Sequence, residues 1–332
     1  MFPIALLLSA CPQALSDDFV FQRDQQSPDN PALGSEFVPD SNPPLASGSP
    51  DAAGSGLDPS DAAVAETQRE AGTPEIDPPD ASTPDAATAD GGSTAEDPAL
   101  VALRAALIHR YRFEGTGPSV IDSVGTADGV TVGAQLSGGA AVLAGTEPSA
   151  PQYIDLPNGL ISGLASASFE AWVYWDVDAT ASTSSWQRIF DFGSNSSTTE
   201  GQQGSNAHNL YLAPKSGGVS GKLHFEYRSQ NDGDFNVDGP SAMPARVQVQ
   251  IVAVLDDTAS TLTVYQNGLL QGSVYSAAVL SAIPDSNNWL GRSQYDGDPA
   301  FQGRILDFRI YAAALTQAQI QLSFDRGPDG DL

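Results

Sequence analysis

Hydrophobic residues follow a strand-like pattern through most of the chain after residue 107. Short runs in which apolar and polar positions alternate are separated there by turns rich in Gly, Asn, Asp and Pro. Alternation with a period of two is typical of strands that bury one face. Residues 247–255 begin with clear alternation, and residues 305–311 form the last long run. Residues 169–175 are apolar on both faces beyond Glu170, so we expect a central strand packed on two sides there.

Turn and capping signals divide the same region further. Asn267 and Gly268 supply the two positive-φ residues of a type I′ turn, which predicts a hairpin over residues 262–270. Thr316 and Gln319 form a Thr-x-x-Gln capping box, which predicts a helix over residues 316–322. Further short strands are expected at residues 108–113, 153–156, 189–193, 210–212 and 223–227. Many short strands joined by turns predict an all-β fold, a two-sheet antiparallel jelly-roll sandwich.

Composition changes the picture before residue 101. Residues 12–100 are dominated by Pro, Asp, Ala, Ser, Gly and Thr, and they hold 18 acidic residues against two Arg and no Lys. Such a segment buries too little apolar surface to offset its chain entropy, so we expect a disordered acidic stalk. The predicted organisation is a linker over residues 12–100, a domain over residues 101–326 and a flexible tail over residues 327–332.

The first eleven residues resemble a bacterial lipoprotein signal. Residues 2–10 are largely apolar, and residues 8–11 read Leu-Ser-Ala-Cys, similar to a lipobox. The resemblance implies that residues 1–11 direct secretion across the inner membrane and that Cys11, the single cysteine, carries the lipid anchor at the bacterial cell envelope or surface. The alternative is a chance apolar start followed by an unrelated cysteine. No other stretch approaches the roughly 20 apolar residues of a membrane span.

Charge restricts the partners. The formal net charge is −27, and like charges repel, so nucleic acid and anionic lipid headgroups are unfavourable ligands.

Several of these runs resemble the LamG-like jelly rolls of the concanavalin A-like lectin/glucanase superfamily. Residues 107–115 are similar to the opening strand of that family, and residues 168–173 to its serine-phenylalanine…tryptophan-valine strand. Residues 264–268 carry its tyrosine-x-asparagine-glycine hairpin. The most specific match is residues 290–311. The resemblance implies a jelly-roll fold, and a binding function by analogy.

Catalytic motifs are not found. Glycosidases of this fold carry paired carboxylates on one strand, and Glu226, the nearest candidate, lacks an acidic residue two positions away. His109, His208 and His224 accompany no nucleophile-elbow motif and no cysteine, so neither triad nor zinc chemistry is indicated. We therefore expect no enzymatic activity.

The resemblance also implies one structural Ca²⁺, held by carboxylate and carbonyl oxygens. Two sets of ligands are possible: Glu114, Asp122 and Asp307, or Asp191, Asp296 and Asp298. Solvated carboxylates in an acidic protein are the alternative for each residue. Residues 234–239 match the first half of an EF-hand loop but lack its Glu, so we interpret them as a polar hairpin turn.

Three aromatic residues, Trp186, Trp289 and Tyr295, lie near predicted strand ends and are candidates for a ligand site at the rim. Trp172 and Trp175 are expected in the core. The sequence therefore predicts a surface-displayed, non-enzymatic binding module for a glycan or a protein. The alternatives are a structural or adhesive domain without a small ligand, or an accessory domain associated with carbohydrate hydrolysis.

Overall fold

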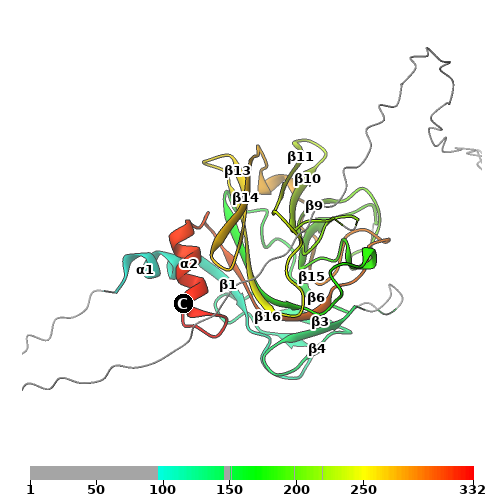
Figure 1. Ribbon diagram of the computed structural model, residues 1–332, viewed down its shortest axis with the longest axis horizontal. Helices are drawn as coiled ribbons and strands as arrows, with labels where there is room; N and C mark the ends of the chain where they lie inside the picture. Colours follow the sequence, from blue (N-terminus) through cyan, green and yellow to red (C-terminus); the bar gives the residue numbers. More distant parts are fainter. Residues whose placement is uncertain (1–95, 146–149, 151, 198, 219) are drawn as a thin grey trace, which may run out of the picture. The chain divides into compact units, whose positions relative to one another are not determined.

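A computed structural model describes residues 96–332, apart from residues 146–149, 151, 198 and 219 (Figure 1). The expected stalk lies outside them, except for its last five residues.

The described chain forms two antiparallel sheets of eight strands each, which confirms the predicted sandwich. The first sheet has the order β14 (Leu269–Tyr275), β13 (Thr261–Gln266), β12 (Gln248–Asp256), β7 (Ala167–Trp175), β16 (Gln302–Tyr311), β5 (Ala141–Ala144) and β4 (Gln135–Leu136), and β1 (Leu107–Tyr111) pairs with β16. The second sheet has the order β11 (Gly233–Asp238), β10 (His224–Ser229), β9 (His208–Ala213), β8 (Phe190–Ser194), β15 (Asn287–Leu290), β6 (Tyr153–Leu156), β3 (Gly129–Val132) and β2 (Ser119–Val120). Two 3₁₀ turns, η1 (Ser182–Ser184) and η2 (Leu280–Ala282), lie between strands.

The inward faces of both sheets form one core. Phe169 of β7 and Phe308 of β16 meet Phe190 of β8, with ring centroids 5.1 and 5.8 Å apart. All three side chains are fully buried, and each contributes roughly 2–3 kcal/mol of transfer free energy. The strand β7 is buried along almost its whole length, as its apolar faces predict.

Two local signals are confirmed in detail. Asn267 and Gly268 join β13 to β14 with φ angles of 50° and 76°, the left-handed pair of a type I′ turn. Thr316 and Gln319 form both hydrogen bonds of the capping box before α2 (Gln317–Arg326). The helix is longer than expected and ends at Gly327, whose φ of 76° breaks it.

The helix α1 (Pro98–Ala106) was not expected. Asp97 caps it by accepting a hydrogen bond from the backbone N–H of Ala99, and Leu100 and Leu103 are buried. The helices α1 and α2 lie side by side on the outer face of the first sheet (Figure 1). The folded part therefore includes residues that were assigned to the linker.

Two further expectations need correction. Residues 234–238 belong to the strand β11, which pairs along its whole length with β10, and are not a turn. Residues 327–332, expected as a flexible tail, are tied to the first sheet. The carbonyl oxygen of Pro328 accepts hydrogen bonds from Arg110 and Arg309, and that of Gly330 accepts one from Arg110.

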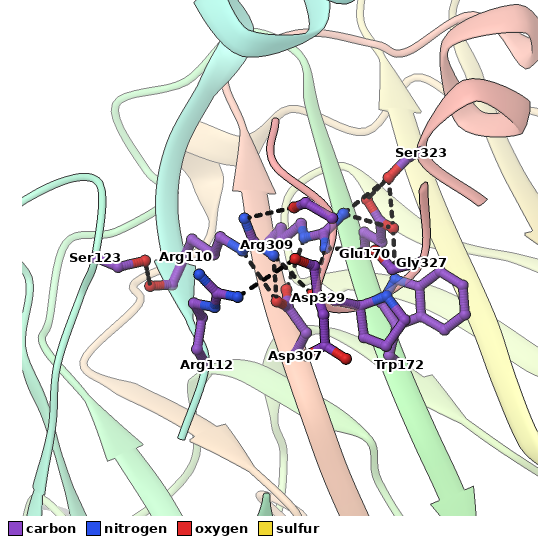
Figure 2. Close-up of polar contacts among 12 residues, drawn as sticks. Arg110, Arg112, Ser123, Glu170, Trp172, Asp307, Arg309, Ser323, Gly327 and Asp329 are labelled. Atoms are coloured by element: carbon purple, nitrogen blue, oxygen red, sulfur yellow. Dashed lines mark hydrogen bonds and ion pairs between the residues drawn. The ribbon is translucent and has the colours of Figure 1, made fainter. Parts of the chain in front are cut away.

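A buried charge network closes the outer face of the first sheet beneath α2. Glu170 accepts hydrogen bonds from Arg309 and Ser323 (Figure 2). It accepts a third from the hydroxyl of Tyr311. Burial alone would raise the pKa of Glu170, but the Arg309 guanidinium and the neutral donors hold it below its usual value. The carboxylate of Asp307 lies between the guanidinium groups of Arg110 and Arg309 (Figure 2). The network and α2 thus cover the part of the outer face of the first sheet around Glu170.

Candidate functional site

The outer face of the second sheet carries a row of polar side chains. Along β10, Phe225 and Tyr227 are part of the core, so His224, Glu226 and Arg228 project from the opposite face. The strand register places Glu226 beside Tyr211 of β9 and Tyr211 beside Asp191 of β8. The row therefore crosses three neighbouring strands.

Three adjoining hollows follow this face. The central one, of about 440 Å³, is lined by Trp186, Arg188, Tyr211, Glu226, Arg228, Tyr295, Asp296, Gly297 and Asp298. A second, of about 420 Å³, shares Arg228 and Tyr295 with it. A third, of about 640 Å³, shares Trp186, Gly297 and Asp298. These sizes fall within the usual range for ligand sites. We call the three hollows together the groove.

Trp186 stands where the central hollow meets the largest one. Its φ of 64° lies in the left-handed region, which bulky side chains rarely adopt. Two backbone contacts fix this conformation: its N–H donates to the carbonyl of Lys215 over 2.8 Å, and its carbonyl accepts from Nη1 of Arg188 over 2.7 Å. The ring is half-buried and meets the His224 ring edge-on at 5.5 Å. Strain of this kind is retained where surrounding contacts impose it, often at ligand sites.

Tyr295 stands at the opposite junction. It is half-buried, and its hydroxyl accepts a hydrogen bond from Nη1 of Arg228 over 2.6 Å. Its backbone carbonyl accepts one from the side-chain amide of Gln203. Two aromatic side chains on irregular segments thus frame a floor made by the sheet.

Arg188 forms part of that floor and is only 2% exposed. Its guanidinium lies 3.9 Å from the centre of the Tyr211 ring, 2.7 Å from Oδ2 of Asp298 and 3.4 Å from Oδ2 of Asp191. Burial raises the pKa of Asp191 to about 6, although Arg188 and the Asn209 amide oppose the shift.

Glu226 is the carboxylate at the centre of the row. It accepts hydrogen bonds from the hydroxyl of Tyr211 and from Nε2 of His224, each over 2.8 Å, and pairs with Arg228. Burial alone would raise its pKa, but His224, Tyr211 and Arg228 hold the pKa of Glu226 below its usual value. The Nδ1 of His224 lies 2.7 Å from Asp238. Ionised and surrounded by donors, Glu226 suits a structural acceptor and not the raised-pKa acid that glycoside hydrolysis needs.

The structure brings together two of the three predicted aromatic residues. Trp186 and Tyr295 both line the central hollow. Trp289 does not, because it is fully buried beneath the Tyr153 ring, at 5.6 Å, and the Arg292 guanidinium, at 4.5 Å. The expectation for Trp289 is therefore wrong: its ring is covered by Tyr153 of β6 and by Arg292 of the loop after β15.

The first predicted calcium set does not converge. Glu114 is exposed and lies 3.6 Å from Arg112. Asp122 accepts hydrogen bonds from the backbone N–H groups of Arg110 and of the following loop. Asp307 pairs with the Arg110 guanidinium. Arginine and backbone donors therefore occupy the oxygens that a cation would need.

The carboxylates of the second predicted calcium set do not converge on one point either. Asp191 and Asp298 both face Arg188, while Asp296 is exposed at the rim of the groove. In the part of the chain that the structure describes, no group of three or more Asp, Glu, His and Cys side chains is placed to hold a metal ion. Calcium binding stays a prediction.

Cys11 lies outside the described residues, and its lipidation stays a prediction. None of the helices that the structure describes is long and apolar enough to span a membrane.

Four groove residues were not singled out for binding from the sequence: Arg188, Tyr211, Glu226 and Arg228. Alternation along β9 and β10 indicates only that some of these side chains face outward. The position of Arg188, two residues before the start of β8, carries no comparable signal.

Comparisons with known proteins agree with this architecture. The profile of a family described as the concanavalin A-like lectin/glucanases superfamily matches residues 148–321, just over half of the chain. No curated protein matches it.

Among solved structures, domain 4 of AbnA, a GH43 extracellular arabinanase from Geobacillus stearothermophilus in complex with arabinotriose, is similar with a TM-score of 0.50 and 23% identity, over 65% of this chain and 96% of that one. The binding domain of botulinum neurotoxin serotype C1 is similar with a TM-score of 0.50 and 14% identity, over 67% of this chain and 52% of that one. This chain thus matches about half the length of the toxin domain. At these identities the likeness shows the fold alone.

Proposed function

The chain belongs to the concanavalin A-like lectin/glucanase superfamily, and on that basis we propose that it is a non-enzymatic module that binds a glycan in the groove on the second sheet. The observation that carries the proposal is the placement of Trp186. A half-buried indole, held in a strained backbone conformation at the junction of two hollows, offers the accessible part of its ring to a ligand. Tyr295 offers a second aromatic ring across the central hollow.

The lining chemistry supports a sugar. Sugars present apolar C–H faces and a ring of hydroxyl groups, so they suit aromatic surfaces flanked by planar polar groups. Trp186 and Tyr295 supply the aromatic surfaces. Arg228, Asp296 and Asp298 supply the planar polar groups. The hollows continue on both sides of the centre, so the groove suits an internal stretch of a polymer better than a single sugar residue.

A non-enzymatic role is supported by the state of the carboxylates. In the central hollow, Glu226 and Asp298 are each paired with arginine. The arabinotriose complex of the AbnA domain is an example of a similar fold bound to a glycan.

We also propose that the module is displayed at the bacterial envelope through a lipid on Cys11. The support is the lipobox-like sequence at residues 8–11 and the long acidic, proline-rich segment between Cys11 and the domain. An extended segment of this kind would hold the groove away from the membrane.

Affinity electrophoresis of the purified full chain through gels containing arabinan, xylan, galactan or mannan tests the glycan proposal. We expect retardation by at least one of them. Trp186→Ala should abolish it. Tyr275→Ala, which removes a 70% exposed ring from β14 of the other sheet, should leave it unchanged. The proposal fails if no polysaccharide retards the chain, or if both variants behave alike.

A further inference from the structure

Resting on the proposed glycan function, we infer that the groove selects uncharged polysaccharides and rejects acidic ones. An acidic sugar loses hydration on entering a half-buried site, and it recovers that loss only where a cation is free to pair with it. The lining of the groove holds two arginines, Arg188 and Arg228. Both are already committed to carboxylates of the protein.

Arg188 cannot turn toward a ligand. It is 2% exposed and packs its guanidinium face on the Tyr211 ring at 3.9 Å. Its Nη2 donates to Asp298, its Nη1 donates to the carbonyl of Trp186, and its Nε lies 3.4 Å from Asp191. Releasing it would leave two carboxylates without their cation and would free the backbone of Trp186.

Arg228 is more accessible, with 37% of its side chain exposed, but it has three partners. Its Nη2 lies 2.8 Å from Oε1 of Glu226, its Nε lies 3.1 Å from Oδ2 of Asp234, and its Nη1 donates to the hydroxyl of Tyr295. The nearby His208 ring accepts a hydrogen bond at Nδ1 from the backbone N–H of Gln230. No lining residue therefore offers an uncommitted cation.

The remaining charge in the groove is negative. Glu226, Asp234, Asp296 and Asp298 line the hollows against the two arginines. Asp296 is exposed at the rim, and the side chain of Asp234 is 51% exposed. An acidic polymer would meet these carboxylates before it reached the aromatic rings, whereas hydroxyl groups of an uncharged sugar could donate to them.

The residue pair Arg228–Asp234 controls this selectivity. Asp234 lies on the edge strand β11, directly across from Arg228 in the strand register. Replacing it with Asn keeps the side-chain size but removes one of the two carboxylates that hold the guanidinium. Glu226, which is buried, would be left in place.

The test uses polymers that differ in charge but not in backbone. Affinity electrophoresis of the full chain in 0.15 M salt compares methyl-esterified with de-esterified homogalacturonan, and hydroxyethylcellulose with carboxymethylcellulose; arabinan and chitosan complete the panel. Salt at this level screens the general acidity of the chain beyond about 8 Å. We expect retardation only by uncharged polymers, and a preference of at least about tenfold within any matched pair that binds.

Asp234→Asn should reduce the preference for the uncharged polymer by roughly threefold, or strengthen binding to the acidic polymer of the pair by the same factor. A change of roughly threefold is the size of effect expected from one surface ion pair. Asp257→Asn removes an exposed charge outside the groove lining and should change nothing. We expect an acidic polymer or cationic chitosan to bind less well than the uncharged polymers do. If one binds as well, and Trp186→Ala abolishes that binding, the selectivity is overturned and glycan binding stands. If the two Asn variants shift the ratio equally, Arg228–Asp234 does not set it. If nothing binds, both proposals fall.

Discussion

The guanidinium of Arg188 stacks on the ring of Tyr211, with 3.9 Å between its central carbon and the ring centre. The same guanidinium holds Asp298 from one loop and the carbonyl of Trp186 from another. One buried side chain on the second sheet thus holds two residues at the junction between the central hollow and the largest one. Contacts within the domain therefore fix this junction of the groove.

Substitutions at Trp186 should separate binding from stability. Trp186→Gly and Trp186→Ala both remove the ring, and we expect each to weaken glycan binding by at least about tenfold. Gly accepts a φ of 64° without strain, whereas Ala does not. The glycine variant should therefore be more stable than the alanine variant by roughly 1 kcal/mol. Urea denaturation measures the difference, and equal stabilities would contradict the strain argument.

The network beneath α2 should dominate the stability of the first sheet. Arg309→Met leaves Glu170 and Asp307 buried with fewer compensating charges, so we expect a loss of about 3–5 kcal/mol in the free energy of unfolding. Arg112→Met removes an exposed pair with Glu114 and a long hydrogen bond to the carbonyl of Asp329, and it should cost less than about 1 kcal/mol. Thermal denaturation of both variants compares them. Similar losses would mean that the network does not hold the helix.

Asp191 should make stability depend on pH in an unusual direction. Its folded pKa of about 6 lies above the ordinary carboxyl value of 3.8, so the folded state binds the proton more tightly than the unfolded state. The stabilising contribution is complete below pH 3.8 and is lost as the pH rises through about 6. Between pH 4 and 7 the wild type should therefore lose roughly 2–3 kcal/mol relative to Asp191→Asn.

The absolute free energy of unfolding of Asp191→Asn is less informative than the change of that free energy with pH. The new amide meets the backbone N–H of Gln294, which adds a cost that does not vary with pH. Denaturation at several pH values isolates the slope. Asp257→Asn, an exposed replacement, should follow the wild type throughout. A constant difference between the wild type and Asp191→Asn would show that Asp191 does not titrate in this window.

Lipidation of Cys11 can be tested in cells. A chain expressed in a bacterium with its native N-terminus should incorporate radioactive palmitate and fractionate with membranes. Cys11→Ser should lose the label and enter the soluble fraction, since the chain has no other cysteine. If the serine variant still incorporates palmitate, Cys11 is not the lipidated residue and the proposed anchor is contradicted.

The sandwich could be predicted from the sequence because its determinants are local. Alternation in β12, the Asn267–Gly268 turn and the Thr316 capping box each act within a few residues. The helix α1 was missed although Asp97 and Pro98 form a good helix start, because its short apolar stripe adjoins a long polar segment. Its stability comes from packing on α2 and the first sheet, which no local pattern reveals.

The groove could be predicted only in part. Trp186, Tyr295 and Trp289 were all recognised as aromatic residues near strand ends. Trp289 differs from the other two only because Tyr153 and Arg292 pack over its ring. The roles of Arg188 and Asp298 depend on a contact between residues 110 positions apart. Long-range pairing of this kind is set by topology and not by spacing in the sequence.

Tryptophan fluorescence gives the most direct test of the central claim, that Trp186 contacts the ligand. Trp172, Trp175 and Trp289 are each at most 4% exposed, so Trp186 is the one indole of four that solvent can reach. We expect acrylamide to quench a part of the emission that Trp186→Phe lacks, and a polysaccharide that retards the chain to protect that part from quenching. If the polysaccharide binds while quenching of Trp186 is unchanged, the ligand lies elsewhere and the groove is not the binding site.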